Sequence, residues 1–128
     1  LNAQGNTHPL NNLSPCISLA ELQFLQQQVK QVRISEELKH YIVSIVSETR
    51  HLADIQLGAS PRASLHLMKT SQALALIDGL EFVTPDIIQE LAVPVIAHRL
   101  NLNAQSKFAG ITTAQLVQTI IQKLPIPH

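Results

Sequence analysis

Five helix start signals, each followed by apolar residues at helical spacing, constrain the fold of this chain more than any other feature. Each signal is a Ser or Thr whose side chain can accept a hydrogen bond from the first helical turn. Two of them carry Glu or Gln three residues later, which forms a capping box, and two carry proline at the first helical position. The predicted helices span residues 18–30, 35–53, 60–78, 84–100 and 113–124. This pattern predicts an all-α fold built as a five-helix bundle.

Local breaks in the pattern refine this picture. Residues 32–34 and 80–83 are short and extended, and they are candidates for a minimal two-strand ribbon. Residues 73–77 are apolar on every side, and such a helix is normally buried all round, so we expect the third helix at the centre of the domain. Pro94 has no N–H group for the helical ladder and is expected to kink or split the fourth helix.

The composition is that of one globular domain. The 128 residues are 45% hydrophobic, enough for a core, but only 3% aromatic, so Leu, Ile, Val and Ala must fill that core. Lys plus Arg equals Asp plus Glu at 9 each, which makes nucleic acid a poor partner. No apolar run reaches the ~18 residues of a membrane helix and no signal-peptide pattern is present, so we expect no membrane span. The single cysteine, Cys16, excludes an internal disulfide and a cysteine-based zinc site, and it favours a cytoplasmic location.

The sequence lacks the common motifs of a self-contained enzyme. It contains no phosphate-binding G-x-x-x-x-G-K-[ST] loop, no G-x-S-x-G nucleophile turn and no H-E-x-x-H zinc motif. Its six histidines are scattered without the close spacing of a metal pair, so we predict no metal site. The acidic pair Glu36 and Glu37 opens a helix, where the helix dipole already explains it. The chain is therefore expected not to catalyse a reaction by itself.

The most informative stretch is Gly58-Ala59-Ser60-Pro61-Arg62, where a loop enters the third helix. A helix N-terminus presents unpaired N–H groups and a partial positive charge, so it attracts anions. Arg62 adds a cation in the turn where the dipole disfavours one, which suggests that it meets a phosphate. His66 and Lys69 follow on the same face. The alternative interpretation is a solvated basic face with no ligand.

The run Leu57-Gly58-Ala59-Ser60-Pro61-Arg62-Ala63-Ser64 closely resembles the sensor 2 segment of the MoxR family of AAA+ ATPases. Further segments that resemble the family are residues 9–10, 19–26, 32–35, 41–42, 73–79, 83–86 and 98–100. The resemblance covers roughly residues 9–127. Ile87 departs from it, standing where the family commonly has an acidic residue, and so does Val93. Neither departure touches the sensor segment.

The resemblance implies that the chain is the C-terminal helical lid of a MoxR-type ATPase. In that family a separate α/β core carries the Walker motifs, sensor 1 and the arginine finger, and it binds ATP with Mg²⁺. The lid closes over the nucleotide and the subunits form a homo-oligomeric ring. The family is associated with chaperone-like maturation of client proteins, among them proteins with von Willebrand factor A domains. The partners implied here are therefore the ATPase core, neighbouring subunits and such clients.

The resemblance also assigns roles to individual residues. Arg62 corresponds to the sensor 2 arginine, a catalytic residue that approaches the γ-phosphate in its own or a neighbouring subunit. Gly58, Ala59, Ser60 and Pro61 form the nucleotide-facing segment that leads into its helix. Tyr41 and Ile42 are expected on the adenine side of the cleft.

The expected organisation is a linker or end of the ATPase core at residues 1–17, followed by the lid at residues 18–128. The chain begins at Leu1 and not at methionine, so we expect it to be cut from a longer protein. Two other functions remain open at this stage. One is a helical protein–protein adaptor without a nucleotide role. The other is a DNA-binding helical domain, which would need a basic recognition helix that zero net charge disfavours.

Overall fold

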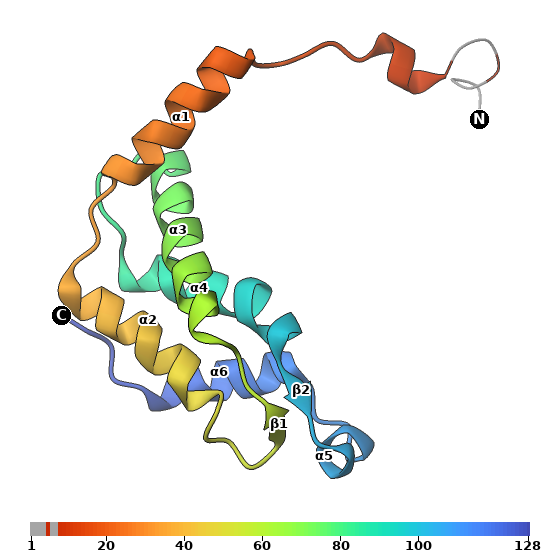
Figure 1. The fold of residues 1–128 in the computed structure, drawn as a ribbon, viewed down its shortest axis with the longest axis vertical. Coiled ribbons are helices and arrows are strands. Elements are labelled where there is room, and N and C mark those ends of the chain that lie inside the picture. Colours follow the sequence, from red (N-terminus) through yellow and green to blue (C-terminus); the bar gives the residue numbers. More distant parts are fainter. Residues whose placement is uncertain (1–4, 6–7) are drawn as a thin grey trace.

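A computed structural model describes Gly5 and residues 8–128, and Figure 1 shows how its helices are arranged. The helices are α1 (Leu19–Gln31), α2 (Glu36–Glu48), α3 (Pro61–Ile77), α4 (Pro85–Ile96), α5 (Ala104–Phe108) and α6 (Thr113–Lys123). Two 3₁₀ helices, Pro9–Asn12 and Ala97–Arg99, and two strands, β1 (Ile55–Leu57) and β2 (Asn101–Leu102), complete the described part. The all-α fold and the five predicted helices are confirmed, and α5 is an addition.

The helix start signals act as their chemistry predicts in four cases. The side chains of Ser18, Ser35, Thr84 and Thr112 each accept a hydrogen bond from the backbone N–H three residues later. The capping boxes predicted at the starts of α1 and α6 are both complete. Local side-chain chemistry therefore sets where these helices begin.

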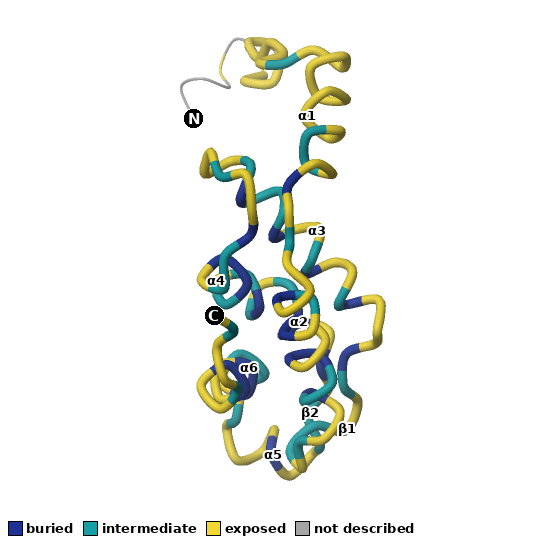
Figure 2. Tube along the Cα trace, turned by 90° about the vertical axis from the view of Figure 1, so that its left-hand side faces the viewer, coloured by how far each residue is buried: buried dark blue, intermediate teal, exposed yellow. Residues whose placement is uncertain are grey.

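Helix α3 contacts α1, α2 and α4 and runs along the long axis of the molecule (Figure 1). Its buried side is a row of residues four apart, namely Ala63, Leu67, Ser71 and Ala75, all fully buried. The prediction that its second half is buried on all sides is wrong, because Ile77 is 79% exposed. The apolar run stays partly uncovered because the end of α3 rises past α2 and α4 to the end of the molecule where α1 lies (Figure 2).

The predicted ribbon between residues 32–34 and 80–83 is reduced to one parallel bridge between Arg33 and Phe82. In it the Arg33 N–H donates to the Glu81 carbonyl at 3.0 Å, and the Val83 N–H donates to the Arg33 carbonyl at 2.8 Å. This bridge ties the connection between α1 and α2 to the connection between α3 and α4.

A two-stranded antiparallel sheet forms instead between β1 and β2, in segments that lie between the predicted helices. The segment after β2 is closed onto the α2–α3 connection by side chains. Asn103 caps α5 by accepting from Ser106 N–H at 2.8 Å, and its amide donates to the Ala53 carbonyl at 2.8 Å. Ser106 in turn donates to Asp54 at 2.6 Å.

Pro94 lies inside α4, which continues past it by less than one turn and then tightens into the 3₁₀ helix Ala97–Arg99. The loss of one ladder hydrogen bond at proline accounts for this early end of the α-helical geometry. None of the helices in the described residues is both long enough and apolar enough to cross a membrane.

Candidate functional site

The loop that leads into α3 is fastened to the end of α2 by buried hydrogen bonds. The Ala59 N–H donates to Thr49 Oγ1 at 3.0 Å, and the same hydroxyl donates to the Val46 carbonyl at 2.6 Å. The Arg50 Nε donates to the Ala59 carbonyl at 3.0 Å. Thr49 and Ala59 are both buried, so neither backbone group of Ala59 is left to water. The start of α3 is thereby held in a fixed position relative to α2.

Gly58 is required at this loop because the backbone of α2 passes too close for any side chain. A Cβ built on Gly58 would lie 2.8 Å from the Thr49 carbonyl oxygen and 2.8 Å from the Arg50 Cγ. Real Cβ atoms essentially never approach this closely, and a backbone carbonyl cannot swing away as a flexible side chain can. The glycine of the predicted segment is therefore explained by close approach of two backbones.

Helix α3 begins at Pro61 with Ser60 in the capping position, as predicted, but the Ser60 side chain makes no capping hydrogen bond. The prediction that this serine caps the helix by its side chain is therefore wrong. The first turn of α3 also contains no acidic residue. The Ala63 N–H, the donor that a serine side chain would cap, donates instead to the Ser60 carbonyl at 2.9 Å. No side-chain oxygen therefore offsets the partial positive charge of this helix start, as one does at the other α-helix starts in this chain.

Arg62 is exposed in the first turn of α3, beside the fully buried Ala63 that anchors this turn. Among the residues that the structure describes, the two ion pairs join Lys39 to Glu36 and Lys123 to Glu48. Neither involves Arg62, and the Arg62 side chain makes no hydrogen bond to any residue that the structure describes. An arginine at an uncapped helix start, unpaired within the described residues, can bind an anion with its guanidinium while the partial positive charge of the helix start adds to the attraction.

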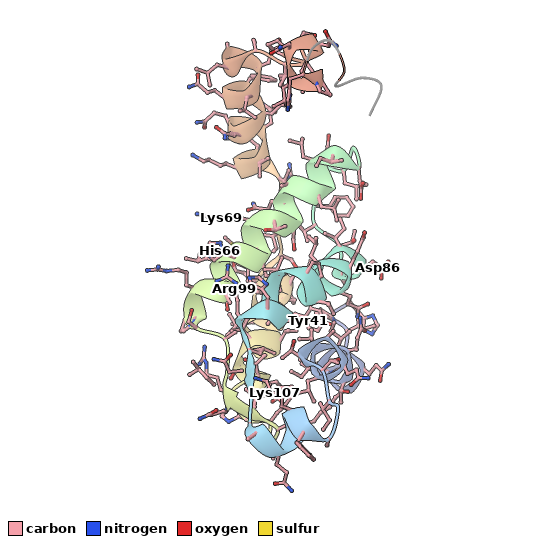
Figure 3. All side chains as sticks on the ribbon, turned by 90° about the vertical axis from the view of Figure 1, so that its right-hand side faces the viewer. Tyr41, His66, Lys69, Asp86, Arg99 and Lys107 are labelled. Atoms are coloured by element: carbon pink, nitrogen blue, oxygen red, sulfur yellow. The ribbon has the colours of Figure 1, made fainter. Side chains whose placement is uncertain are left out.

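His66 and Lys69 are exposed on α3 and extend to the same side of it, whereas Asp86 of α4 lies at the other edge of the molecule in Figure 3. His66 and Lys69 therefore lie on one face of α3, as their spacing predicts.

Tyr41 and Ile42 are both buried in the core and face different hollows. The Tyr41 hydroxyl accepts from Gln89 Nε2 at 3.2 Å, and its ring lines a hollow beside the C-terminal residues 124–127. Ile42 instead lines an apolar hollow of about 140 Å³ between α2 and α3, together with Leu65 and Met68. Ser64, two residues after Arg62, lines the same hollow. The structure therefore brings Ile42 near the start of α3 and leaves Tyr41 on another side of α2.

The hollow beside Ile42 has one charged side chain in its lining, Lys39. The Lys39 ammonium donates to Glu36 Oε1 at 2.7 Å, and this hydrogen bond, together with the positive charge of Lys39, holds the pKa of the Glu36 carboxyl below its usual range.

Within the described residues no group of three or more His, Cys, Asp or Glu side chains is placed to hold a metal ion.

Thr49 and Arg50 support the candidate site, yet no motif in the sequence singles them out. Thr49 continues the buried spacing of Ile42, Ile45 and Val46 along α2. A hydroxyl at a position where that spacing demands an apolar residue is the signal that could have identified it, because a buried hydroxyl needs a partner. Arg50 leaves no comparable signal, since its bond to Ala59 joins residues from two separate elements.

Residues 47–120 match a family model described as "AAA lid domain". The chain is 41% identical over 127 residues to the uncharacterized protein YeaC of Bacillus subtilis (strain 168). The aligned region covers 99% of this chain and 40% of YeaC. It is 28% identical over 121 residues to "Chaperone MoxR1" of Mycobacterium tuberculosis, with 88% of this chain and 32% of that protein covered. The chain thus spans two fifths or less of the length of these relatives.

Among solved structures, the fold matches a "putative ATPase" from Cytophaga hutchinsonii with a TM-score of 0.75 and 32% sequence identity. The match covers 80% of this chain and 34% of that one.

Proposed function

Since this chain belongs to the AAA lid domain family and forms the lid of a MoxR-type AAA+ ATPase, we propose that it senses the nucleotide held by the ATPase core. In this proposal the chain contributes no Walker motif and does not hydrolyse ATP alone. It contributes a positioned cation and converts the state of the bound nucleotide into a position of the lid.

The observation that carries the proposal is the junction from Gly58 to Arg62. Arg62 stands exposed at a helix start that no side chain caps, and buried hydrogen bonds to Thr49 and Arg50 fix the loop behind it. Phosphoryl transfer depends on positioning and on stabilising negative charge rather than on covalent chemistry by the protein. An arginine held in this way suits the γ-phosphate of ATP, whose Mg²⁺ would be held by the core.

The apolar hollow next to this junction supports an adenine site on the same side of the lid. Ile42, Leu65 and Met68 line it, and a purine ring is a flat group that binds well between apolar side chains. Ile42 is thus proposed as a base-contacting residue. Tyr41 is retained only as a supporting residue, because its hydroxyl is engaged by Gln89 within the core.

The proposed mechanism links the nucleotide to the lid through the contact between Arg62 and the γ-phosphate. While the γ-phosphate is present, Arg62 holds the lid closed, and after hydrolysis the attraction is lost and the lid can open. In a homo-oligomeric ring the movement would pass to neighbouring subunits and then to a client protein. Chaperone-like remodelling, with clients that include von Willebrand factor A domain proteins, is the corresponding proposal for the whole assembly.

The direct test is Arg62→Ala in the full-length protein. We expect steady-state ATP hydrolysis to fall tenfold or more, a loss of about 1.4 kcal/mol in transition-state stabilisation. Lys107→Ala, which removes an exposed cation on α5, is the matched control and should leave turnover unchanged. Circular dichroism of both variants checks that the lid stays folded. Normal turnover in Arg62→Ala would refute the nucleotide role and favour the adaptor alternative.

A further inference from the structure

Arg99, the last residue of the 3₁₀ helix that follows α4, lies beside the loop that leads into α3. In the antiparallel pair of β1 and β2, Leu57 is the partner of Asn101. Ala59 and Arg99 each stand two residues away from that pair, and in an antiparallel ladder they lie on the same side of it. The backbone of Arg99 therefore adjoins the segment from which α3 starts, although the two are far apart in the sequence.

The Arg99 side chain is exposed and folds back along the last turn of α4. Its Nε donates to the Val95 carbonyl at 3.1 Å, which is the one side-chain hydrogen bond that Arg99 makes to the described residues. Helices α3 and α4 pack against each other. Figure 3 shows Arg99 on the same side of the molecule as His66 of α3, which follows Arg62 by about one helical turn.

The bond to Val95 accounts for only part of the Arg99 guanidinium. An arginine in the last turn of a helix can bind a terminal carbonyl and interacts favourably with the helix dipole, which explains the bond from Nε. It does not explain the two Nη groups at the planar end of the side chain. Those groups form the fork that binds phosphate through two parallel hydrogen bonds.

Both arginines are carried by backbone whose neighbouring residues are buried. Ala63, which follows Arg62, is fully buried, and so are Ala97 and Leu100 near Arg99 to within a few per cent. The Leu100 N–H donates to the Ala97 carbonyl at 3.3 Å and closes the turn that carries Arg99. The two guanidinium groups therefore start from fixed points of the lid.

The two segments that meet at this place carry positive charge and no acid. Residues 55–77 and 91–128 contain no Asp or Glu, and all 9 acidic residues of this neutral chain lie elsewhere. The Lys and Arg residues of these segments are Arg62, Lys69, Arg99, Lys107 and Lys123. Neither of the two ion pairs among the described residues involves Arg62 or Arg99. Neighbouring guanidinium groups repel each other, so an anion that meets both gains from each of them.

We propose that Arg99 is a second phosphate-binding residue of the lid, which contacts the β-phosphate of the nucleotide whose γ-phosphate meets Arg62. The inference rests on the proposed function for the presence of that nucleotide. Because the two arginines come from separate elements, they suit two neighbouring phosphates of one chain rather than a single phosphate. The ligand class is therefore a nucleoside diphosphate or triphosphate, and not a monophosphate.

Two contacts would tie the nucleotide to two parts of the lid. Arg62 belongs to α3, whereas Arg99 leads into β2 and from there into α5. Loss of the γ-phosphate would release α3 while Arg99 still holds the β-phosphate. The lid would then keep ADP bound after hydrolysis and change position around it.

The test measures how tightly the full-length protein binds fluorescent N-methylanthraniloyl derivatives of ATP, ADP and AMP. In Arg99→Gln the glutamine Nε2 stands at the position of the arginine Nε, so the bond to Val95 can remain while the charged end is lost. We expect this variant to bind the ATP and ADP probes about tenfold more weakly and the AMP probe as before. Lys107→Gln, which removes the same charge from α5, is the matched control and should change none of the three affinities.

A second variant separates phosphate binding from capping of α4. Arg99→Lys keeps a positive charge that can bind phosphate, but it lacks the Nε that bonds to Val95. Phosphate binding by Arg99 predicts that the lysine variant binds ADP more tightly than the glutamine variant, and capping alone predicts that it does not. Thermal unfolding followed by circular dichroism should be the same for Arg99→Gln and the wild type.

Four results would each overturn the proposal. They are an unchanged ADP affinity in Arg99→Gln, an equal loss of AMP affinity, a lysine variant that binds ADP no better than the glutamine variant, and a large loss of stability in Arg99→Gln. The turnover of Arg62→Ala separates this inference from the proposed function. If Arg99→Gln binds ADP normally while Arg62→Ala loses turnover, the second phosphate contact fails and nucleotide sensing stands. If Arg99→Gln binds ADP weakly while Arg62→Ala keeps normal turnover, the γ-phosphate role fails and the Arg99 contact stands.

Discussion

Thr49→Val tests whether the end of α2 holds the candidate site in place. Valine keeps the shape of threonine but removes the hydroxyl that accepts from Ala59 N–H at 3.0 Å and donates to the Val46 carbonyl at 2.6 Å. The Val46 carbonyl keeps a bond from the Thr49 backbone N–H at 3.2 Å, so it is not orphaned. The Ala59 N–H, in contrast, is left buried without a partner.

The expected magnitude follows from that one unpaired donor. A buried polar group left without a partner costs about 1–3 kcal/mol, so we expect the free energy of unfolding to fall by about 2 kcal/mol. For a chain of this length that corresponds to a decrease in Tm of about 5–10 °C. Ala59 directly precedes Ser60, the capping residue of α3. The same change should therefore also loosen Arg62 and lower ATP turnover of the full-length protein.

Urea denaturation of the 128-residue chain, followed by circular dichroism, measures the loss of stability. Thr70→Val is the matched control, because the Thr70 hydroxyl is exposed and bonds only to the His66 carbonyl of its own helix at 2.7 Å. We expect this control to change stability by less than about 0.5 kcal/mol. If the two variants are equally stable, the buried Thr49–Ala59 bond does not secure the junction and the reasoning is wrong.

Two further substitutions probe the same loop. Gly58→Ala should destabilise the chain by about 1–3 kcal/mol and reduce ATP turnover, because its Cβ would meet the Thr49 carbonyl oxygen at 2.8 Å; wild-type stability in the same urea titration would contradict this close approach. Ser60→Ala should change stability by less than about 0.5 kcal/mol, since its hydroxyl makes no capping bond, whereas Ser35→Ala should cost about 1 kcal/mol. An equal loss for both serines would show that Ser60 does cap α3 in solution.

The helices could be predicted from the sequence because their signals are local. The capping side chains, the prolines at Pro61 and Pro85 and the positive φ of 76° at Gly79 each act within one turn of the chain. The β1–β2 pair could not be predicted in this way. Strands of three and two residues are too short to show a recognisable alternation, and the pairing of Ile55 with Leu102 joins residues that are far apart in the sequence.

The candidate site, too, could be predicted from the sequence only in part. The segment from Gly58 to Arg62 can be recognised as a string of residues, but the reason for its glycine lies in Thr49 and Arg50, which are close to it only in three dimensions. The apparent capping role of Ser60 shows the opposite error. A residue of the right type stands in the right place with the right backbone conformation, and its side chain still makes no bond.

The missing side-chain cap at α3 has an energetic consequence for the proposed nucleotide sensing. A ligand can shift the lid between two positions only by the difference in its interaction free energy with each of them. At Ser35 the first turn of α2 already spends a donor on its own side chain, and an arriving anion would have to displace that bond. At Ser60 the Ala63 N–H donates to the backbone carbonyl, and no side-chain oxygen stands at the helix start, so a phosphate would meet Arg62 and the helix field without displacing a cap. One charge-assisted hydrogen bond from Arg62, at about 1.5–3 kcal/mol, would shift the lid equilibrium roughly 10- to 150-fold. A side-chain oxygen on α3 would offset part of the positive charge that the phosphate meets, which gives a physical reason for a helix that begins with serine and does not use it as a cap.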